Sequence, residues 1–286
     1  MTSLIGNAPV DGVDVAALLG IPISAEQERA VQAPLKPCAV IAGAGTGKTT
    51  VMAARVVWLV ASRLVSPEEI LGLTFTNKAT AELSERIESN LTRVGLLTSE
   101  QPRPTVATYD SFAGTLVNDY GAWDGISTGA HLITGARAYQ LAAEVVMGLD
   151  KAPLAATHMG PTFIAQAVVK LAGAMASHDA SPGKVRRADA RWRQMLLAAP
   201  TKRGGDRYAD IDKWLSRVDE REELLDLVAA YQNLKKERGL VEFGDRMVQA
   251  LHLVTHHPRV GEELRARYRV VPVSYTHLTL PTTPYV

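Results

Sequence analysis

The stretch Ala42-Gly43-Ala44-Gly45-Thr46-Gly47-Lys48-Thr49-Thr50 decides the fold. It lies between a short apolar run, Cys38 to Ala42, and a segment from Lys48 to Ser62 that has the residue pattern of a helix. The order strand, glycine-rich loop, helix is that of a phosphate-binding loop. Ala42 stands where the strict pattern has glycine, and the rest of the pattern is present.

Each residue type in this loop has a physical role in binding phosphate or Mg²⁺. Glycines let successive backbone N–H groups converge on phosphate oxygens, and the helix N-terminus adds partial positive charge. We expect Lys48 to reach the β- and γ-phosphates and the Thr49 hydroxyl to bind Mg²⁺, which makes both catalytic candidates. The residues expected to bind ATP or GTP are Ala42, Gly43, Ala44, Gly45, Thr46, Gly47, Lys48, Thr49 and Thr50. The alternative is a glycine-rich turn that binds nothing.

The theme of strand followed by helix repeats downstream. Ile70 to Phe75 is predicted to be a buried strand, and apolar residues recur at helical spacing from Ala79 to Val94. A third strand is predicted at Thr105 to Thr108 and a helix from Ser111 to Tyr120. Strands that alternate with helices predict an α/β fold with a parallel sheet.

Beyond Tyr120 the sequence becomes Ala-rich and helical, with no further clear strand until Tyr268 to Val271. We therefore predict a helical domain inserted into the α/β domain. Residues 181–207 are interrupted by Pro and Gly and hold eight Lys or Arg against two Asp. A solvated loop and a contact with a DNA backbone are both open interpretations of this segment.

Composition excludes several classes of protein. Lys and Arg number 31 against 30 Asp and Glu, for a net charge of +1, so nucleic-acid binding would need local basic patches. The single cysteine, Cys38, excludes an internal disulfide framework and favours a reducing, cytoplasmic setting. No apolar run is long enough for a membrane span, and no signal peptide is recognisable. We expect no membrane partner.

Three further segments resemble the UvrD/Rep/PcrA-type superfamily 1 DNA helicases. Leu73 to Leu83 (LTFTNKATAEL) resembles motif Ia of that family, and Ile23 to Val31 (ISAEQERAV) resembles its Q motif. Ala107 to Phe112 (ATYDSF) resembles motif Ib, although Asp110 stands where the family often has His. The resemblance implies a P-loop NTPase fold in which an incomplete RecA-like parallel sheet carries an inserted all-helical subdomain.

The resemblance also implies roles for individual residues. Gln27 would recognise the adenine edge and so impose ATP over GTP. The residues implied to contact single-stranded DNA, or a junction of single and double strands, are Phe75, Thr76, Asn77, Thr108, Tyr109 and Ser111. Aromatic faces can stack on bases and polar side chains can bind phosphates. Without the resemblance, core packing would be the preferred interpretation of Phe75 and Tyr109.

The domain plan implied is a flexible lead-in over 1–23, domain 1A over 24–120, helical insert 1B over 121–240, and a return to domain 1A over 241–271. Gly239 to Asp245 (GLVEFGD) resembles the acidic segment that precedes the Walker B strand. The helix after the P-loop and the second strand look closest to the actinobacterial AdnAB helicase–nuclease subunits, which implies a second helicase–nuclease subunit as a partner. The two His residues His256-His257 lack metal spacing.

The last segment, 272–286, is expected to be non-native. Residues Val273 to Thr282 are what GTC TCT TAT ACA CAT CTG ACG CTG CCG ACG encodes, which resembles the mosaic-end adapter of transposase-made sequencing libraries. The segment contains no Asp or Glu, whereas the family needs an Asp-Glu pair after this strand to hold Mg²⁺ and orient water. We therefore expect a truncated chain that binds ATP without hydrolysing it.

Two alternatives remain open at this point. One is a nucleotide-dependent DNA-binding module without catalysis. The other is another P-loop NTPase, such as a small-molecule kinase, which would not account for the segments that resemble motifs Ia and Ib.

Overall fold

The computed structural model describes residues 14–20, 22–43, 45–127, 129–149, 160–202 and 204–274. They form a helix-rich α/β chain with short parallel sheets, divided into two compact units. Unit 1 contains the described residues up to Phe112 and from His257 onward, and unit 2 contains those from Ala113 to His256.

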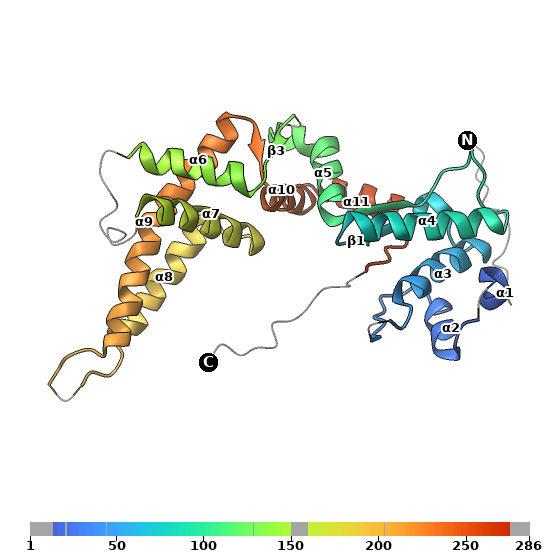
Figure 1. The fold of residues 1–286 in the computed structure, drawn as a ribbon, viewed down its shortest axis with the longest axis horizontal. Coiled ribbons are helices and arrows are strands. Elements are labelled where there is room, and N and C mark those ends of the chain that lie inside the picture. The colour runs from blue at the N-terminus through green and yellow to red at the C-terminus, as the bar shows by residue number, and fades with distance from the viewer. Residues whose placement is uncertain are drawn as a thin grey trace. The chain divides into compact units, whose positions relative to one another are not determined.

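Unit 1 is built around one parallel strand pair (Figure 1). Its elements are α1 (Val15–Leu19), α2 (Ala25–Val31), α3 (Lys48–Ala61), η1 (Pro67–Glu69), β1 (Leu71–Thr74), α4 (Asn77–Arg93), β2 (Thr105–Thr108), the start of α5 (Tyr109–Tyr120) and α11 (Pro258–Arg267). β1 pairs with β2 in parallel, from Leu71 opposite Thr105 to Thr74 opposite Thr108. The predicted β1, β2, α3 and α4 are thereby confirmed to within a few residues.

The core of unit 1 lies between α3, α4 and the strands. β1 is buried at every position, as expected of a strand covered on both faces. Leu83, Ile87 and Leu91 of α4 are each at most 1% exposed and form one apolar stripe that packs in the same cluster as Val56 and Leu59 of α3. This packing fixes α3, and therefore the loop before it, against the β1–α4–β2 motif.

The strand predicted at Cys38 to Ala42 is wrong for this structure. Residues 38–43 have no regular secondary structure, and the side chains of Val40 and Ile41 are 51% and 97% exposed. A strand needs a partner edge for its N–H and C=O groups, and among the described residues none pairs with this segment. The apolar sequence alone therefore does not make this segment a strand.

The strand predicted at Tyr268 to Val271 is reduced to isolated pairing. Val270 forms a parallel bridge with Ile70, and Val273 forms one with Leu73. Backbone bonds from Leu73 N to Pro272 O and from Ser274 N to Leu73 O, both 2.9 Å, continue the pairing. Pro272 has no N–H to contribute, so a regular ladder cannot form there. Backbone hydrogen bonds form whatever the side chains are, so this pairing does not test the non-native origin of 272–286, which stays a prediction. Residues 275–286 lie outside the described residues.

The predicted lead-in over 1–23 is wrong in its last part. Val15–Leu19 forms α1, capped by Asp14, whose side chain accepts from Ala17 N at 3.1 Å. Val15 is fully buried in a cluster with Val31 and Ala54. This burial orders a segment that its Gly and Pro content makes look loose; residues 1–13 and 21 lie outside the described residues.

Unit 2 is mostly helical (Figure 1). Its elements are the rest of α5, η2 (Gly121–Asp124), β3 (His131–Leu132), α6 (Gly135–Met147), α7 (Pro161–Ser177), α8 (Pro182–Leu197), α9 (Ala209–Glu237), β4 (Leu240–Val241) and α10 (Phe243–His256). The core lies where α6, α7 and α9 pack together, around Leu141, Val168 and Leu225, each fully buried. The inserted unit is not all-helical, because β3 pairs with β4 in parallel, as His131 N donates to Gly239 O at 2.8 Å. The assignment of the chain to domains 1A and 1B stays a prediction.

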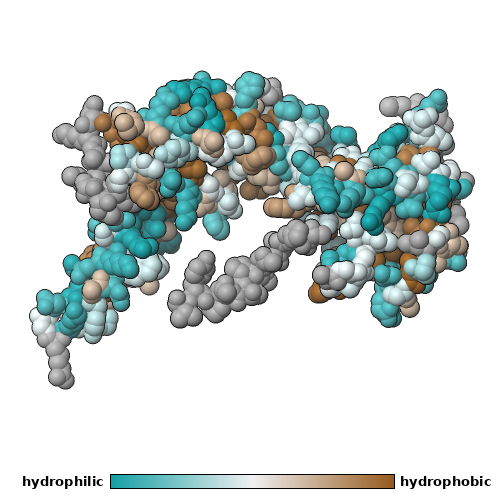
Figure 2. All heavy atoms as spheres, in the orientation of Figure 1, coloured by the Kyte–Doolittle hydropathy of each residue, from teal (hydrophilic) through white to brown (hydrophobic). Residues whose placement is uncertain are grey.

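Residues 181–207 are not simply a loop, because most of them form α8. Ser181 caps the helix by accepting from Lys184 N at 3.2 Å, and Pro182 occupies the first helical position, which suits its fixed φ. Several basic side chains of the segment pair with acidic side chains: Lys184 with Asp179, Arg186 with Glu222 and Asp226, Arg193 with Asp219, and Arg207 with Asp212. Figure 2 shows the visible surface of α8 and α9 as largely hydrophilic. Arg186 and Arg193 therefore join α8 to α9, whereas Lys184 and Arg207 pair with acidic residues near them in the sequence.

No helix in the part of the chain that the structure describes has the length and apolarity required to cross a bilayer.

Candidate functional site

The glycine-rich loop ends in left-handed backbone immediately before α3. Gly45 and Gly47 have φ angles of 76° and 80°, which side-chain-bearing residues rarely adopt. A Cβ added to Gly45 would meet nothing within 4 Å, so this position of the loop faces open space. Ala44, a predicted loop residue, lies outside the described residues.

Lys48 is the first residue of α3, and its amine turns back into the loop. Lys48 Nζ donates to Gly43 O at 2.6 Å and to Ala42 O at 3.2 Å. Thr46 Oγ1 also donates to Gly43 O, at 2.8 Å. The loop is therefore closed around a positive charge at the N-terminus of a 14-residue helix, which is an arrangement that suits an anion.

Gln27 connects the short helix α2 to this loop. Gln27 Oε1 accepts from Ser24 N at 2.9 Å and Ser24 Oγ accepts from Gln27 N at 3.3 Å, which is a capping box. Gln27 Nε2 donates to Thr46 O at 3.2 Å. The structure thus brings the residue predicted to read the base into direct contact with the predicted phosphate loop.

The first turn of α3 also contacts α4. Thr49 and Thr50 follow Lys48 and are half-buried. Arg86 Nη1 of α4 donates to Thr50 Oγ1 at 3.0 Å. This bond ties the loop to the helix that follows β1.

The residues that resemble motif Ia lie at the carboxyl end of β1. Thr76 caps α4, since its hydroxyl accepts from Ala79 N at 3.1 Å, and Asn77 is the first helical residue. Phe75 stands between strand and cap with its side chain 71% exposed. The interpretation of Phe75 as a core residue is therefore wrong, because the strand ends at Thr74, one residue earlier than predicted.

The residues that resemble motif Ib lie at the carboxyl end of β2, beside the first group. Thr108 Oγ1 accepts from Ser111 N at 3.1 Å and donates to Ser111 Oγ at 2.8 Å, which starts α5. Tyr109 is half-buried and packs against Leu71, Leu73 and Tyr268. Parallel pairing of Thr74 with Thr108 places the two groups at one edge of the sheet, whereas Tyr109 is largely a packing residue.

The acidic segment Glu242 to Asp245 forms a buried ionic corner in unit 2. Lys235 of α9 is 2% exposed, and its amine lies 2.6 Å from Glu242 Oε2 and 2.5 Å from Asp245 Oδ2. Tyr231 donates to Glu242 Oε2 at 2.8 Å, and its burial, followed by this bond and the carboxylate charges, raises its pKa. Asp245 Oδ2 also accepts from Glu242 N at 2.9 Å, so the segment caps α10 and locks it to α9.

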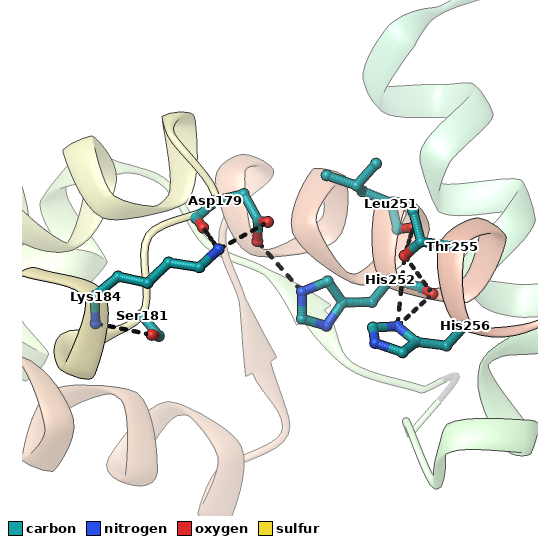
Figure 3. Close-up of polar contacts among 7 residues, drawn as sticks. All are labelled: Asp179, Ser181, Lys184, Leu251, His252, Thr255 and His256. Carbon is teal, nitrogen blue, oxygen red and sulfur yellow. Dashed lines mark hydrogen bonds and ion pairs between the residues drawn. The ribbon is translucent and has the colours of Figure 1, made fainter.

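Figure 3 shows a second polar cluster in unit 2. Its residues border a cleft of about 1100 Å³. His252 Nε2 lies 3.3 Å from Asp179 Oδ1, and Lys184 Nζ donates to Asp179 O at 2.8 Å. The bond with His252 is the main cause that holds the pKa of Asp179 below its usual range. His256 Nδ1 lies 3.0 Å from His252 O. Within the described residues, no group of His, Cys, Asp and Glu is arranged to hold a metal ion.

Three residues of these sites were missed in the sequence. The sequence motifs assigned no role to Arg86, Lys235 or Arg55, the last of which bonds to backbone carbonyls at and after the end of α2. The partner of Arg86 lies 36 residues away in the sequence, those of Lys235 lie 7 and 10 residues away, and those of Arg55 lie 21 to 25 residues away. Only the tertiary structure identifies these partners. For Lys235, the apolar positions around it on α9 would have placed it on the buried face.

Comparison with known proteins agrees with this geometry. Residues 23–273 match the family described as UvrD/REP helicase N-terminal domain. A probable DNA helicase II homolog of Rickettsia conorii is 37% identical over 97 residues, which are 34% of this chain and 14% of that protein. ATP-dependent DNA helicase UvrD1 of Mycobacterium leprae is 48% identical over 65 residues, 23% of this chain and 8% of that protein. DNA helicase II of Escherichia coli is 45% identical over 75 residues, 26% and 10% of the two chains.

The family match extends over most of the chain, whereas each of these three relatives is matched over 14% of its own length or less. The match includes both the loop before α3 and the strand ends of β1 and β2. The chain therefore belongs to the UvrD/REP helicase family, in the part that forms the N-terminal domain.

Proposed function

We propose that this chain is the ATP-binding part of an ATP-dependent DNA helicase that moves along single-stranded DNA, in the 3′ to 5′ direction by family resemblance. The observation that carries the proposal is the loop closed around the Lys48 amine ahead of α3, with Gln27 bonded to it. The full activity, a role in DNA repair, and a second helicase–nuclease subunit are part of the proposal. A cytoplasmic setting is also part of the proposal.

The residues present fit a nucleoside triphosphate with Mg²⁺. Gly45 and Gly47 keep the loop free of side chains, and Lys48 supplies charge for phosphate oxygens. Thr49 would hold Mg²⁺, which neutralises phosphate charge when bound. Gln27 would present its amide to adenine after giving up its bonds to Ser24 and Thr46. We infer a RecA-like nucleotide domain on this basis.

The proposed DNA surface is the edge formed by the ends of β1 and β2. Phe75 offers an exposed ring on which a base can stack, and Asn77 lies beside it at the start of α4. Thr76, Thr108 and Ser111 would contact phosphates, and the half-buried Tyr109 would add a smaller contact.

A second candidate function is nucleotide-dependent DNA binding without turnover. The chain after Val271 contains no Asp or Glu that could orient an attacking water. On this view the chain binds ATP and DNA but hydrolyses nothing, and single-stranded-DNA-stimulated ATPase activity would refute it.

The binding test uses the whole chain and a fluorescent ATP analogue with Mg²⁺. We expect wild type to bind and Lys48→Ala to bind at least about tenfold more weakly, which corresponds to about 1.4 kcal/mol. Lys36→Ala, an exposed lysine outside the loop, is the matched control and should bind as wild type does. Equal binding by wild type and Lys48→Ala would overturn the proposed site.

The DNA test measures anisotropy of a labelled oligothymidine. Phe75→Ala should weaken binding, whereas Phe163→Ala, which removes a ring 65% exposed in unit 2, should not. Stacking on an aromatic side chain contributes about 1–3 kcal/mol per base. If both variants bind like wild type, the β1 edge is not the DNA surface.

A further inference from the structure

Arg55, on the third turn of α3, holds the chain segment that follows α2. Its guanidinium donates to four backbone carbonyl oxygens. Nη1 bonds to those of Val31 at 2.8 Å and Ala33 at 2.7 Å and, at the longer distance of 3.5 Å, to that of Ala30. Nη2 bonds to that of Pro34 at 3.2 Å. Arg55 is half-buried, and the loss of hydration lowers its pKa. A charged side chain placed in this way replaces its hydration with backbone carbonyls.

Two of the carbonyls that Arg55 binds, those of Ala30 and Val31, belong to the last turn of α2, and the other two belong to the segment that follows it. The last carbonyls of a helix have no N–H partner within the helix, and its C-terminus carries partial negative charge. Gln32 N reaches Glu28 O at 2.9 Å, whereas Ala30 O and Val31 O are reached by Arg55. Only a planar guanidinium offers several donors in a fixed fork, so lysine cannot reproduce the contact.

A helix of seven residues does not persist in water without tertiary contacts. α2 has a capping box at its N-terminus, Arg55 at its C-terminus, and Val31 buried against Ala54 of α3. Gln27 lies between these anchors and reaches the loop at Thr46. The orientation of α2 on α3 therefore fixes where the Gln27 amide stands relative to Lys48.

We propose that Arg55 is a positioning residue that sets the preference for adenine over guanine, because it anchors α2 to the helix that carries the phosphate loop. The inference rests on the proposed function, in which Gln27 reads the base and Lys48 the phosphates. Loss of Arg55 leaves α3 and its loop in place but releases the carbonyl end of α2. Phosphate binding then survives while base discrimination does not.

The experiment compares the dissociation constants of fluorescent ATP and GTP analogues for the whole chain, with Mg²⁺. The ratio of the two constants is the readout, because a variant that is partly unfolded binds both nucleotides less in equal proportion. We expect Arg55→Ala to reduce the preference for ATP by about tenfold, with GTP binding nearly unchanged, and Arg55→Lys to restore only part of it. Gln27→Ala should lose the preference as Arg55→Ala does.

Arg93→Ala is the matched control. Arg93 Nη2 likewise donates to a backbone carbonyl, Leu18 O at 2.8 Å, but it anchors α1 rather than α2. This variant should keep the ratio of wild type even if it is less stable.

The outcomes distinguish a failure of this inference from a failure of the proposed function. If Arg55→Ala keeps the wild-type ratio, or if Arg93→Ala loses it equally, Arg55 does not position the base reader, although ATP binding stands. If wild type binds both nucleotides equally well, the selectivity inference fails and the phosphate site stands. If wild type binds neither nucleotide, both the proposed function and this inference are overturned.

Discussion

Gly244, in the first turn of α10, allows α10 to approach α7 closely. A Cβ added at this position would lie 2.9 Å from the Cβ of Ala176, whereas carbon atoms in contact prefer about 3.5–4.0 Å. The helices would have to separate by roughly half an ångström or more, and such overpacking costs about 1–3 kcal/mol. The helix propensity of alanine returns up to about 1 kcal/mol. We therefore expect Gly244→Ala to lower the stability of unit 2 by about 1–2 kcal/mol.

The assay is native-state hydrogen exchange of the amides of α7 and α10, resolved by mass spectrometry. A loss of about 1.4 kcal/mol makes exchange roughly tenfold faster. Gly173→Ala on α7 is the matched control, because its added Cβ meets nothing within 4 Å, and it should slow exchange. The double variant Gly244→Ala/Ala176→Gly should recover most of the loss. If Gly244→Ala slows exchange as Gly173→Ala does, the close approach of the two helices is refuted.

Three other predictions concern the packing of unit 2. Lys235→Met should lower the unfolding free energy by about 3 kcal/mol, which is the lower end of the range for breaking a buried ion pair. The lower end applies because the Glu242 side chain is 25% exposed to water, and faster hydrogen exchange in α9 would show the loss. The raised pKa of Tyr231 makes stability fall as the pH rises past about 10, where the unfolded chain deprotonates but the folded one does not, and Tyr231→Phe should flatten this fall in alkaline denaturation curves. Asp189→Asn should cost about 1.5 kcal/mol in urea unfolding, because Asp189 is 6% exposed and forms two bonds to an arginine of α9; no loss would contradict that role.

Local sequence sufficed where an element is defined by contacts near in sequence. β1 was predicted because a short apolar run precedes a segment of helical spacing, and α3 because the loop motif fixes its start at Lys48. The capping box of Ser24 and Gln27 is of the same local kind, since it closes within three residues. These are cases in which the sequence separation between cause and effect is small.

The rest depended on distant partners. The run from Cys38 to Ala42 has the composition of a strand, yet a strand exists only when another edge accepts its hydrogen bonds. α8 was missed because Pro182 and the basic residues suggested a loop, although Pro is common at a first helical position. The anchoring roles of Arg55 and Lys235 depend on partners in other elements; the apolar pattern of α9 indicates that Lys235 is buried, but it does not identify the partners.

The hydroxyl groups at the edge of β1 and β2 differ in what they can still offer to a ligand. A hydroxyl has one proton to donate and two lone pairs. Thr108 accepts from Ser111 N and gives its proton to Ser111 Oγ, so its hydrogen-bonding capacity serves the start of α5. Thr76 accepts from Ala79 N through Oγ1, which uses a lone pair and leaves its proton in an exposed position beside Asn77. A phosphate at this edge would therefore meet Thr76 and Asn77 before Thr108. The exposed ring of Phe75 stands next to them, and this makes the end of β1, rather than the end of β2, the part of the proposed DNA surface that carries most of the contact.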